Sequence, residues 1–110
     1  MEITFSDKKL LKLSADYNKC CQKMGDRMAK LFITRLNALS DAETLEDVRH
    51  LPGRFHELTD NRKGQWSCDL VHPYRLVFTP HEDPIPVNEH GQYIWLEITG
   101  VQIIEIADYH

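Results

Sequence analysis

The feature that most constrains this chain is the stretch from Leu51 to Pro80, which has the pattern of a meander of short strands. Its extended runs are at residues 54–58, 65–71 and 74–79. They are joined by Asp60-Asn61-Arg62-Lys63-Gly64 and by His72-Pro73. Asp, Asn and Gly adopt turn conformations at low cost. The stretch therefore predicts two hairpin bends in an antiparallel sheet.

Positive charge gathers in and beside this meander. The segment from Arg49 to Arg75 contains five of the thirteen Lys and Arg residues and three of the six His residues, and no Lys or Arg follows Arg75. Residues 81–110 contain six acidic residues, and the formal net charge of the chain is −4. An acidic total argues against a general polyanion binder. The meander is the segment whose charge favours a phosphate ligand.

The part of the chain before the meander is predicted to be mostly helical. The expected elements are a strand over residues 2–5 and helices over residues 8–15, 17–39 and 42–49. The long helix is predicted because apolar residues from Tyr17 to Leu39 recur at steps of three and four. Gly25 is a weak point in it, since glycine in a helix costs up to about 1 kcal/mol relative to alanine.

The part after the meander begins with a loop, because residues 80–93 contain three prolines and a glycine. Alternating side chains then predict a strand over residues 94–99, and a run that is apolar on both faces predicts a central strand over residues 101–107. The fold class expected is α+β. An N-terminal strand and two to three helices pack on one face of a mostly antiparallel sheet of four to five strands, in one domain over residues 1–110.

Several classes of protein are not expected. The three cysteines show no C-x-x-C spacing, and we interpret them as small buried apolar residues in a reducing compartment. The histidines have no metal-ligand spacing, so neither a metal site nor a cofactor is expected. No apolar run approaches the roughly 20 residues of a membrane span, and the N-terminus lacks the core of a signal peptide. We therefore expect a cytoplasmic protein without a membrane partner.

Three motifs together resemble a known family of toxins. They are the run H-x-L-x-x-x-R-x-G-x-W-S from His56 to Ser67, the strand Y-R-L-V-F from Tyr74 to Phe78, and D-Y-H at residues 108–110. With helices placed before them, the chain resembles the HigB branch of the RelE/ParE toxin superfamily over nearly its whole length. The killer proteins of that branch look most similar.

The resemblance implies a toxin of a type II toxin-antitoxin system. Such toxins cleave mRNA, usually in the ribosomal A site, and are silenced by an antitoxin encoded beside them. The implied partners are a helix-turn-helix antitoxin and mRNA on the ribosome, and a heterotetramer of toxin and antitoxin is one assembly that the family allows. No cofactor is implied.

Carried over position by position, the functional residues of the family fall on His56, Arg62, Arg75, Asp108, Tyr109 and His110. The family commonly has a lysine where this chain has Thr59, and Lys63 in the same bend is the candidate replacement. The family is also usually basic, whereas this chain is acidic. We therefore expect residues 81–110 to form a face turned away from RNA, with the segment from Arg49 to Arg75 as the local positive patch.

These residue types suit RNA cleavage without a metal, which needs a base, an acid and cations for the phosphate. His56 and His110 are the candidate acid-base pair, without an assignment of which accepts and which donates, because imidazole has both protonation states populated near neutral pH. Arg75 would bind the non-bridging phosphate oxygens. The remaining candidates are Asp108 to orient an imidazole, Tyr109 to stack on a base, and Arg62 and Lys63 to bind the RNA backbone.

Other readings stay open on the sequence alone. His56 also fits an ordinary half-buried histidine, Arg75 an exposed or ion-paired arginine, and residues 108–110 a frayed end. Trp66 is expected in the core with Cys68 and Leu70. Two other functions are compatible with the same fold: a toxin that inhibits an enzyme such as gyrase, as the ParE branch suggests, and an inactive relative that chiefly binds its antitoxin.

Overall fold

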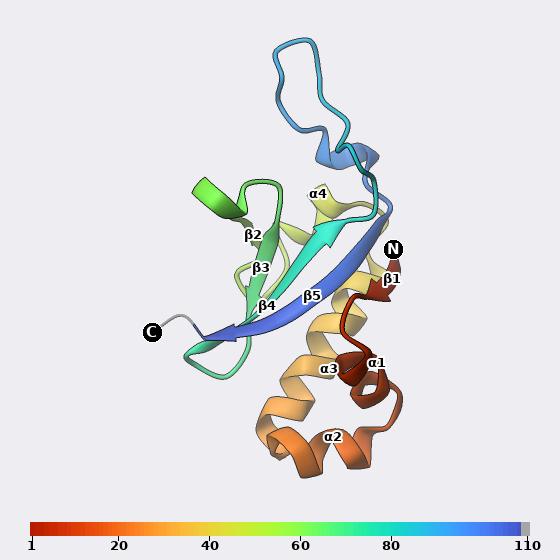
Figure 1. Ribbon diagram of the computed structural model, residues 1–110, viewed down its shortest axis with the longest axis vertical. Helices are drawn as coiled ribbons and strands as arrows, with labels where there is room; N and C mark the ends of the chain where they lie inside the picture. Colours follow the sequence, from red (N-terminus) through yellow and green to blue (C-terminus); the bar gives the residue numbers. More distant parts are fainter. Residues whose placement is uncertain (109–110) are drawn as a thin grey trace.

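The computed structural model describes residues 1–108, and its centre is a five-stranded sheet in the order β1-β5-β4-β3-β2 (Figure 1). The strands are β1 (Glu2–Phe5), β2 (His56–Glu57), β3 (Trp66–Asp69), β4 (Tyr74–Pro80) and β5 (Gly100–Asp108). β1 and β5 pair in parallel, and the other neighbouring strands pair antiparallel. The predicted α+β class with a mostly antiparallel sheet is confirmed.

The helices are α1 (Lys8–Ala15), α2 (Tyr17–Met24), α3 (Asp26–Asp41) and α4 (Leu45–Val48). The prediction of one long helix over residues 17–39 is wrong, because the chain turns a corner at Gly25, where φ is +85°. Glycine adopts this conformation without steric cost. Among residues 1–108, no helix has the length and apolar content needed to cross a bilayer.

The main hydrophobic core lies between α3 and one face of the sheet. Its fully buried side chains include Phe32 and Leu39 of α3 and Leu76, Phe78 and Ile103 of the sheet. Burying a side chain of this size contributes about 1.5–3 kcal/mol to stability. The predicted core positions in β3 and just after it are confirmed, since Trp66, Cys68 and Leu70 all belong to the buried core cluster.

The strand predicted over residues 94–99 is absent. The chain there forms a short 3₁₀ helix, η2 (Trp95–Glu97), because Trp95 and Ile98, three residues apart, are the buried side chains while Leu96 is 65% exposed. Trp95 packs edge-on against Trp66 with ring centroids 5.4 Å apart. This aromatic contact, rather than the local alternation, sets the conformation.

Two further departures shape the site. The strand predicted over residues 54–58 is reduced to His56–Glu57, since Gly53 and Arg54 have φ values of +117° and +54°, outside the β region. The bend predicted at residues 60–64 contains a 3₁₀ turn, η1 (Asp60–Arg62). Between β4 and η2 the chain projects beyond the sheet, at the end of the molecule opposite α1 and α2 (Figure 1).

Candidate functional site

The face of the sheet turned away from the main core, which we call the open face, carries a row of polar side chains. The register places His56 opposite Ser67, Ser67 opposite Val77, and Val77 opposite Glu105. Residues directly opposite each other share a face, and neighbours along a strand alternate. Since the flanking residues of β3 and β4 point into the core, this row points the other way.

The middle of the row is buried. Ser67 and Val77 have no exposed surface, although Val77 does not belong to the main core cluster. Side chains lying over the open face must therefore exclude water from the middle of the sheet. Because water is excluded there, the local dielectric constant is low, and electrostatic interactions between side chains at the edges of this region are strengthened.

His56 is held in one tautomer. Its Nδ1 lies 2.7 Å from the carbonyl oxygen of Arg54, and because a carbonyl oxygen only accepts hydrogen bonds, Nδ1 carries a proton and donates it. In the neutral ring the lone pair is then on Nε2, which lies 3.5 Å from the Ser67 hydroxyl oxygen, at the outer limit of hydrogen-bonding distance. Nε2 is the atom available to accept or deliver a proton over the open face.

The turn that supplies the Arg54 carbonyl is anchored from α3. Arg35 donates hydrogen bonds from Nε to the Asp69 carbonyl (2.8 Å) and from a terminal guanidinium nitrogen to the Pro52 carbonyl (3.5 Å). The Asp69 amide donates to the Gly53 carbonyl at 2.7 Å. A Cβ on Gly53 would lie 2.7 Å from the Arg35 guanidinium, so this position admits only glycine without rearrangement.

Arg62 reaches from the turn after β2 across the open face to β5. One terminal guanidinium nitrogen donates to Gln65 Oε1 at 2.9 Å, and the other lies 2.6 Å from Glu105 Oε1. The Arg62 side chain is 33% exposed and that of Glu105 is 43% exposed. Both therefore remain accessible to a ligand, and at this exposure the pair stabilises the fold by no more than about 1 kcal/mol.

Arg75 shares the open face with Asp69, which lies opposite it in the register. The two are joined by an Nε–Oδ1 distance of 3.7 Å, and Arg54 approaches the other oxygen of Asp69 at 3.6 Å. These three residues line a small hollow of about 70 Å³ together with His72. The ion-paired arginine that the sequence left as an alternative for Arg75 is therefore present, on the same face as His56.

Two candidates lie apart from this group. Lys63 turns away from its neighbour Arg62, and its Nζ lies 5.7 Å from the ring centre of Tyr93. Asp108 lies opposite Tyr74 at the end of β5, and alternation gives it the face of Tyr74 rather than that of Arg75. Tyr109 and His110 lie outside the described residues.

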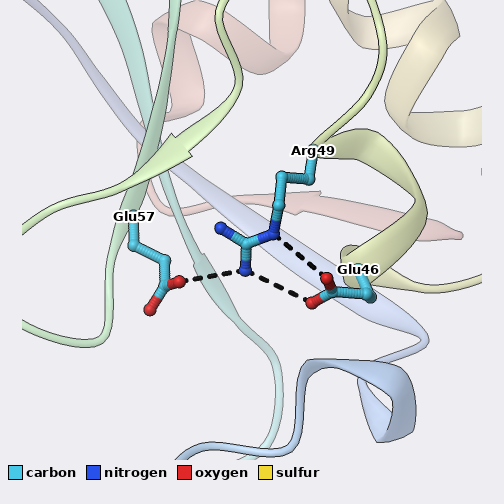
Figure 2. A network of polar contacts seen from close by, with 3 residues as sticks. All are labelled: Glu46, Arg49 and Glu57. Carbon is cyan, nitrogen blue, oxygen red and sulfur yellow. Dashed lines mark hydrogen bonds and ion pairs between the residues drawn. The ribbon is translucent and has the colours of Figure 1, made fainter.

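Arg49, which lies just before the meander, belongs to a separate network (Figure 2). It contacts Glu46 at 3.1 Å and Glu57 at 2.9 Å, and its guanidinium carbon lies 4.8 Å from the centre of a Trp66 ring. The hydrogen bond to Glu46 is the main cause that raises the pKa of Arg49. Each of the five Lys and Arg side chains between Arg49 and Arg75 thus has a partner within the chain, so the expected positive patch is largely neutralised.

Sequence reasoning missed the carboxylates of the site, Asp69 and Glu105, and its tautomer anchor, the Arg54 carbonyl. For Glu105 a signal exists, since it is the one charged residue in the run from Val101 to Ala107. A carboxylate in an apolar strand calls for a cationic partner. Within residues 1–108, no cluster of three or more His, Cys, Asp or Glu side chains is arranged to hold a metal ion.

Comparison with known proteins bears on this arrangement. The chain matches the model of a family described as HigB-like toxin, the RelE-like toxin of the type II toxin-antitoxin system HigB, over residues 3–90. No curated protein matches the chain.

Two similar solved structures come from Staphylococcus aureus. One is a YoeB-YefM complex, 22% identical, covering 100% of this chain and 97% of that chain, with a TM-score of 0.59. The other is a YoeB dimer, 24% identical with the same coverage and a TM-score of 0.56. At these identities the likeness shows a shared fold.

Proposed function

Because the chain belongs to the HigB-like family of RelE-like toxins of type II toxin-antitoxin systems, we propose that it is an endoribonuclease that cleaves mRNA on the ribosome. The observation that carries this proposal is that an imidazole held in one tautomer and two arginines lie on the same face of the sheet. His56 Nε2 points over the open face, where Arg62 and Arg75 also lie. This constellation supplies a proton-transfer group and two cations suited to phosphate.

The reaction proposed is attack of the ribose 2′-hydroxyl on the adjacent phosphorus. A bond forms from the 2′-oxygen to phosphorus while the bond from phosphorus to the 5′-oxygen breaks, and a proton leaves the first oxygen as another reaches the second. His56 and His110 are proposed as the acid-base pair. A neutral His56 accepts at Nε2, and a protonated His56 donates from the same atom. The chemistry is carried by side chains, without a metal ion.

The arginines must exchange partners for this to work. Arg75 contacts Asp69, and Arg62 contacts Glu105. A phosphodiester replaces one anion by another at the same guanidinium, so the exchange releases a half-exposed pair whose net contribution is within about 1 kcal/mol. In this proposal Asp69 and Glu105 hold the arginines in place until RNA arrives. Lys63, on its own side of the bend, would bind RNA backbone outside the catalytic group.

The proposed regulator is a helix-turn-helix antitoxin encoded beside the toxin. Its support is the family, whose members belong to toxin-antitoxin systems, and the fold shared with a toxin solved as a YoeB-YefM complex. Within the toxin we propose that residues 1–110 act as one domain in the cytoplasm. Asp108 and Tyr109 are proposed to orient the imidazole of His110 and the substrate base.

The test of this function compares two messages that differ only in their start codon. The wild-type protein should arrest growth and produce new 5′ ends within the translated message but not within the message that lacks the start codon. His110→Ala should abolish these ends, and a residue added after His110 should weaken them. Growth arrest with intact mRNA and inhibited supercoiling would contradict the proposal and favour a gyrase-directed toxin. Normal growth with antitoxin binding retained would indicate an inactive relative.

A further inference from the structure

A groove between α1 and α2 carries a concentration of positive charge that lies apart from the open face. Its volume is about 330 Å³, and the two helices that line it lie at the end of the molecule opposite the projecting loop (Figure 1). The side chains that line it are Lys9, Lys12, Leu13, Lys19 and Lys23. Four of the five are lysines and none is acidic, so we call it the lysine groove.

The geometry of the two helices produces this lining. Lys9 and Lys12 are three residues apart on α1, and Lys19 and Lys23 are four residues apart on α2, so each pair projects from one helix face. Asp16 caps α2, joins the two helices and turns one against the other. Two pairs of lysines, one from each helix, therefore line one hollow.

The nearby carboxylates are committed to the backbone. Asp7 accepts hydrogen bonds from the amides of Lys9 and Leu10, and Asp16 accepts from the amide of Lys19. Among residues 1–108, none of the four lysine ammonium groups has an ion-pair or hydrogen-bond partner. The cations of the meander are all partnered. In a chain whose net charge is −4, the lysine groove is thus a cationic surface whose described lysines are not ion-paired.

We propose that the lysine groove binds the phosphodiester backbone of folded RNA. Lysine is a compact point charge that binds phosphate without demanding one geometry. A protein partner would instead need buried aromatic or apolar anchors, and interface centres are depleted in lysine. Leu13 is the one apolar side chain in the lining. The identity of the RNA as part of the ribosome rests on the proposed function, whereas binding to the backbone does not.

The proposal gives a division of labour between two surfaces. The lysine groove docks the protein on structured RNA through sequence-independent, salt-sensitive contacts. The open face then meets the single-stranded message with arginines that are released from their carboxylates. Since the two surfaces are built from separate elements, α1 and α2 for one and β2 to β5 for the other, they can be altered independently.

The experiment measures binding of a fluorescently labelled RNA hairpin by anisotropy over a range of salt concentrations. Lys12→Gln combined with Lys19→Gln removes one charge from each wall of the groove. Each lost phosphate contact should reduce the slope of log K against log salt by about 0.9, so the double variant should lose about 60-fold in affinity at 0.1 M salt. Lys12→Arg with Lys19→Arg should restore binding.

The matched control is Lys8→Gln with Lys30→Gln, which removes the same charge from exposed lysines that do not line the groove. Thermal unfolding of each variant reports folding. Equal affinity of the groove and control variants would overturn the proposal. So would loss of binding to the antitoxin but not to the hairpin, which would assign the groove to an acidic protein. If the wild type binds the hairpin through the groove yet cleaves no mRNA, the proposed function fails and this inference stands.

Discussion

The open face and the lysine groove are both cationic, but they hold their charge in opposite ways. On the open face Arg54, Arg62 and Arg75 are each matched with a carboxylate. In the groove four lysines share a hollow with no acidic side chain in its lining. Pairing fixes where a guanidinium points, which chemistry needs, whereas unpaired charge provides attraction that does not depend on geometry. A count of basic residues along the sequence does not reveal this difference.

The contrast predicts different failures for the two regions. Substitutions on the open face should slow cleavage while RNA still binds, and substitutions in the groove should weaken binding while bound RNA is still cleaved.

The largest effect expected is that of His56→Ala, since a positioned acid or base contributes about 10² to 10⁴ in rate. The single-turnover rate of mRNA cleavage on ribosomes should fall by that factor. The affinity of His56→Ala for the RNA hairpin should equal that of the wild type. An affinity as low as that of Lys12→Gln with Lys19→Gln would contradict the separation of cleavage and binding between the two surfaces.

The next largest effect should come from a change in the turn before β2, which should affect the open face but not the groove. Gly53→Ala forces a side chain onto a residue with φ of +117° and against the Arg35 guanidinium, so we expect a loss of about 2 kcal/mol in unfolding free energy, roughly 30-fold in the unfolding equilibrium. Cleavage should fall as well, because the turn orients His56, while hairpin binding should not. Chemical denaturation measures the first effect.

Gly91→Ala is the control for that change. Gly91 also has a positive φ, +76°, but nothing lies within 4 Å of the Cβ it would gain. Strain alone should cost about 1 kcal/mol there. Equal losses at the two glycines would show that the contact with Arg35 does not hold the turn.

Each of the two regions is backed by a buried thiol. Burial raises the pKa of the Cys68 thiol, in β3, to about 12, and it raises the pKa of Cys20, on α2, as well. A thiol whose pKa is raised by folding contributes stability that is complete below the unfolded value near 9 and is lost as the pH rises towards 12. By pH 10 the loss from Cys68 should be about 1.4 kcal/mol, tenfold in the unfolding equilibrium.

Unfolding by urea between pH 8 and pH 10.5 measures this loss as the difference between the wild type and Cys68→Ala. The alanine variant should show a shallower decline. Cys21→Ala, at a partly exposed thiol, should follow the wild type. Parallel curves for wild type and Cys68→Ala would mean that water reaches the back of β3.

The smallest effect should come from making the open face more like the groove. Glu105→Gln leaves Arg62 without its carboxylate, so its charge becomes available to RNA. One extra phosphate contact to single-stranded RNA changes the salt slope by about 0.7, or about fivefold in affinity at 0.1 M salt. Glu97→Gln removes the same charge from an exposed site and should change affinity much less. An equal gain in affinity for the two variants would show that the effect comes from net charge and not from the release of Arg62.

The parts of the fold that local signals control could be predicted from the sequence. β1 and α1 have the predicted boundaries because alternation at residues 2–5 and the Asp7 cap act within a few residues. The strand expected at residues 94–99 failed because Trp95 packs on Trp66, a residue 29 positions earlier whose place depends on the whole sheet. Gly25 was recognised as weak, but only the packing of α2 against α3 decides that the chain turns there.

The site divides in the same way. His56, Arg62 and Arg75 were found through the family resemblance. Their partners Asp69 and Glu105 were not, because the contact between Arg62 and Glu105 spans 43 positions and depends on the strand order. The lysine groove was missed for a related reason. The spacing of Lys9, Lys12, Lys19 and Lys23 is readable, but whether two helices face their lysines towards one hollow depends on the corner at Asp16.

The parallel pairing of β1 with β5 has a consequence for how the molecule comes into being. Glu2 to Phe5 are synthesised long before their sheet partners, Gly100 to Ile103. In the nascent chain, β1 has no strand to pair with until β5 is made. The sheet that carries His56 and Arg75 therefore stays incomplete until β5 has left the exit tunnel. Sheet closure across so long a separation is slow compared with local helix formation. The ribosome must therefore translate β5 and release it from the exit tunnel before the open face is complete.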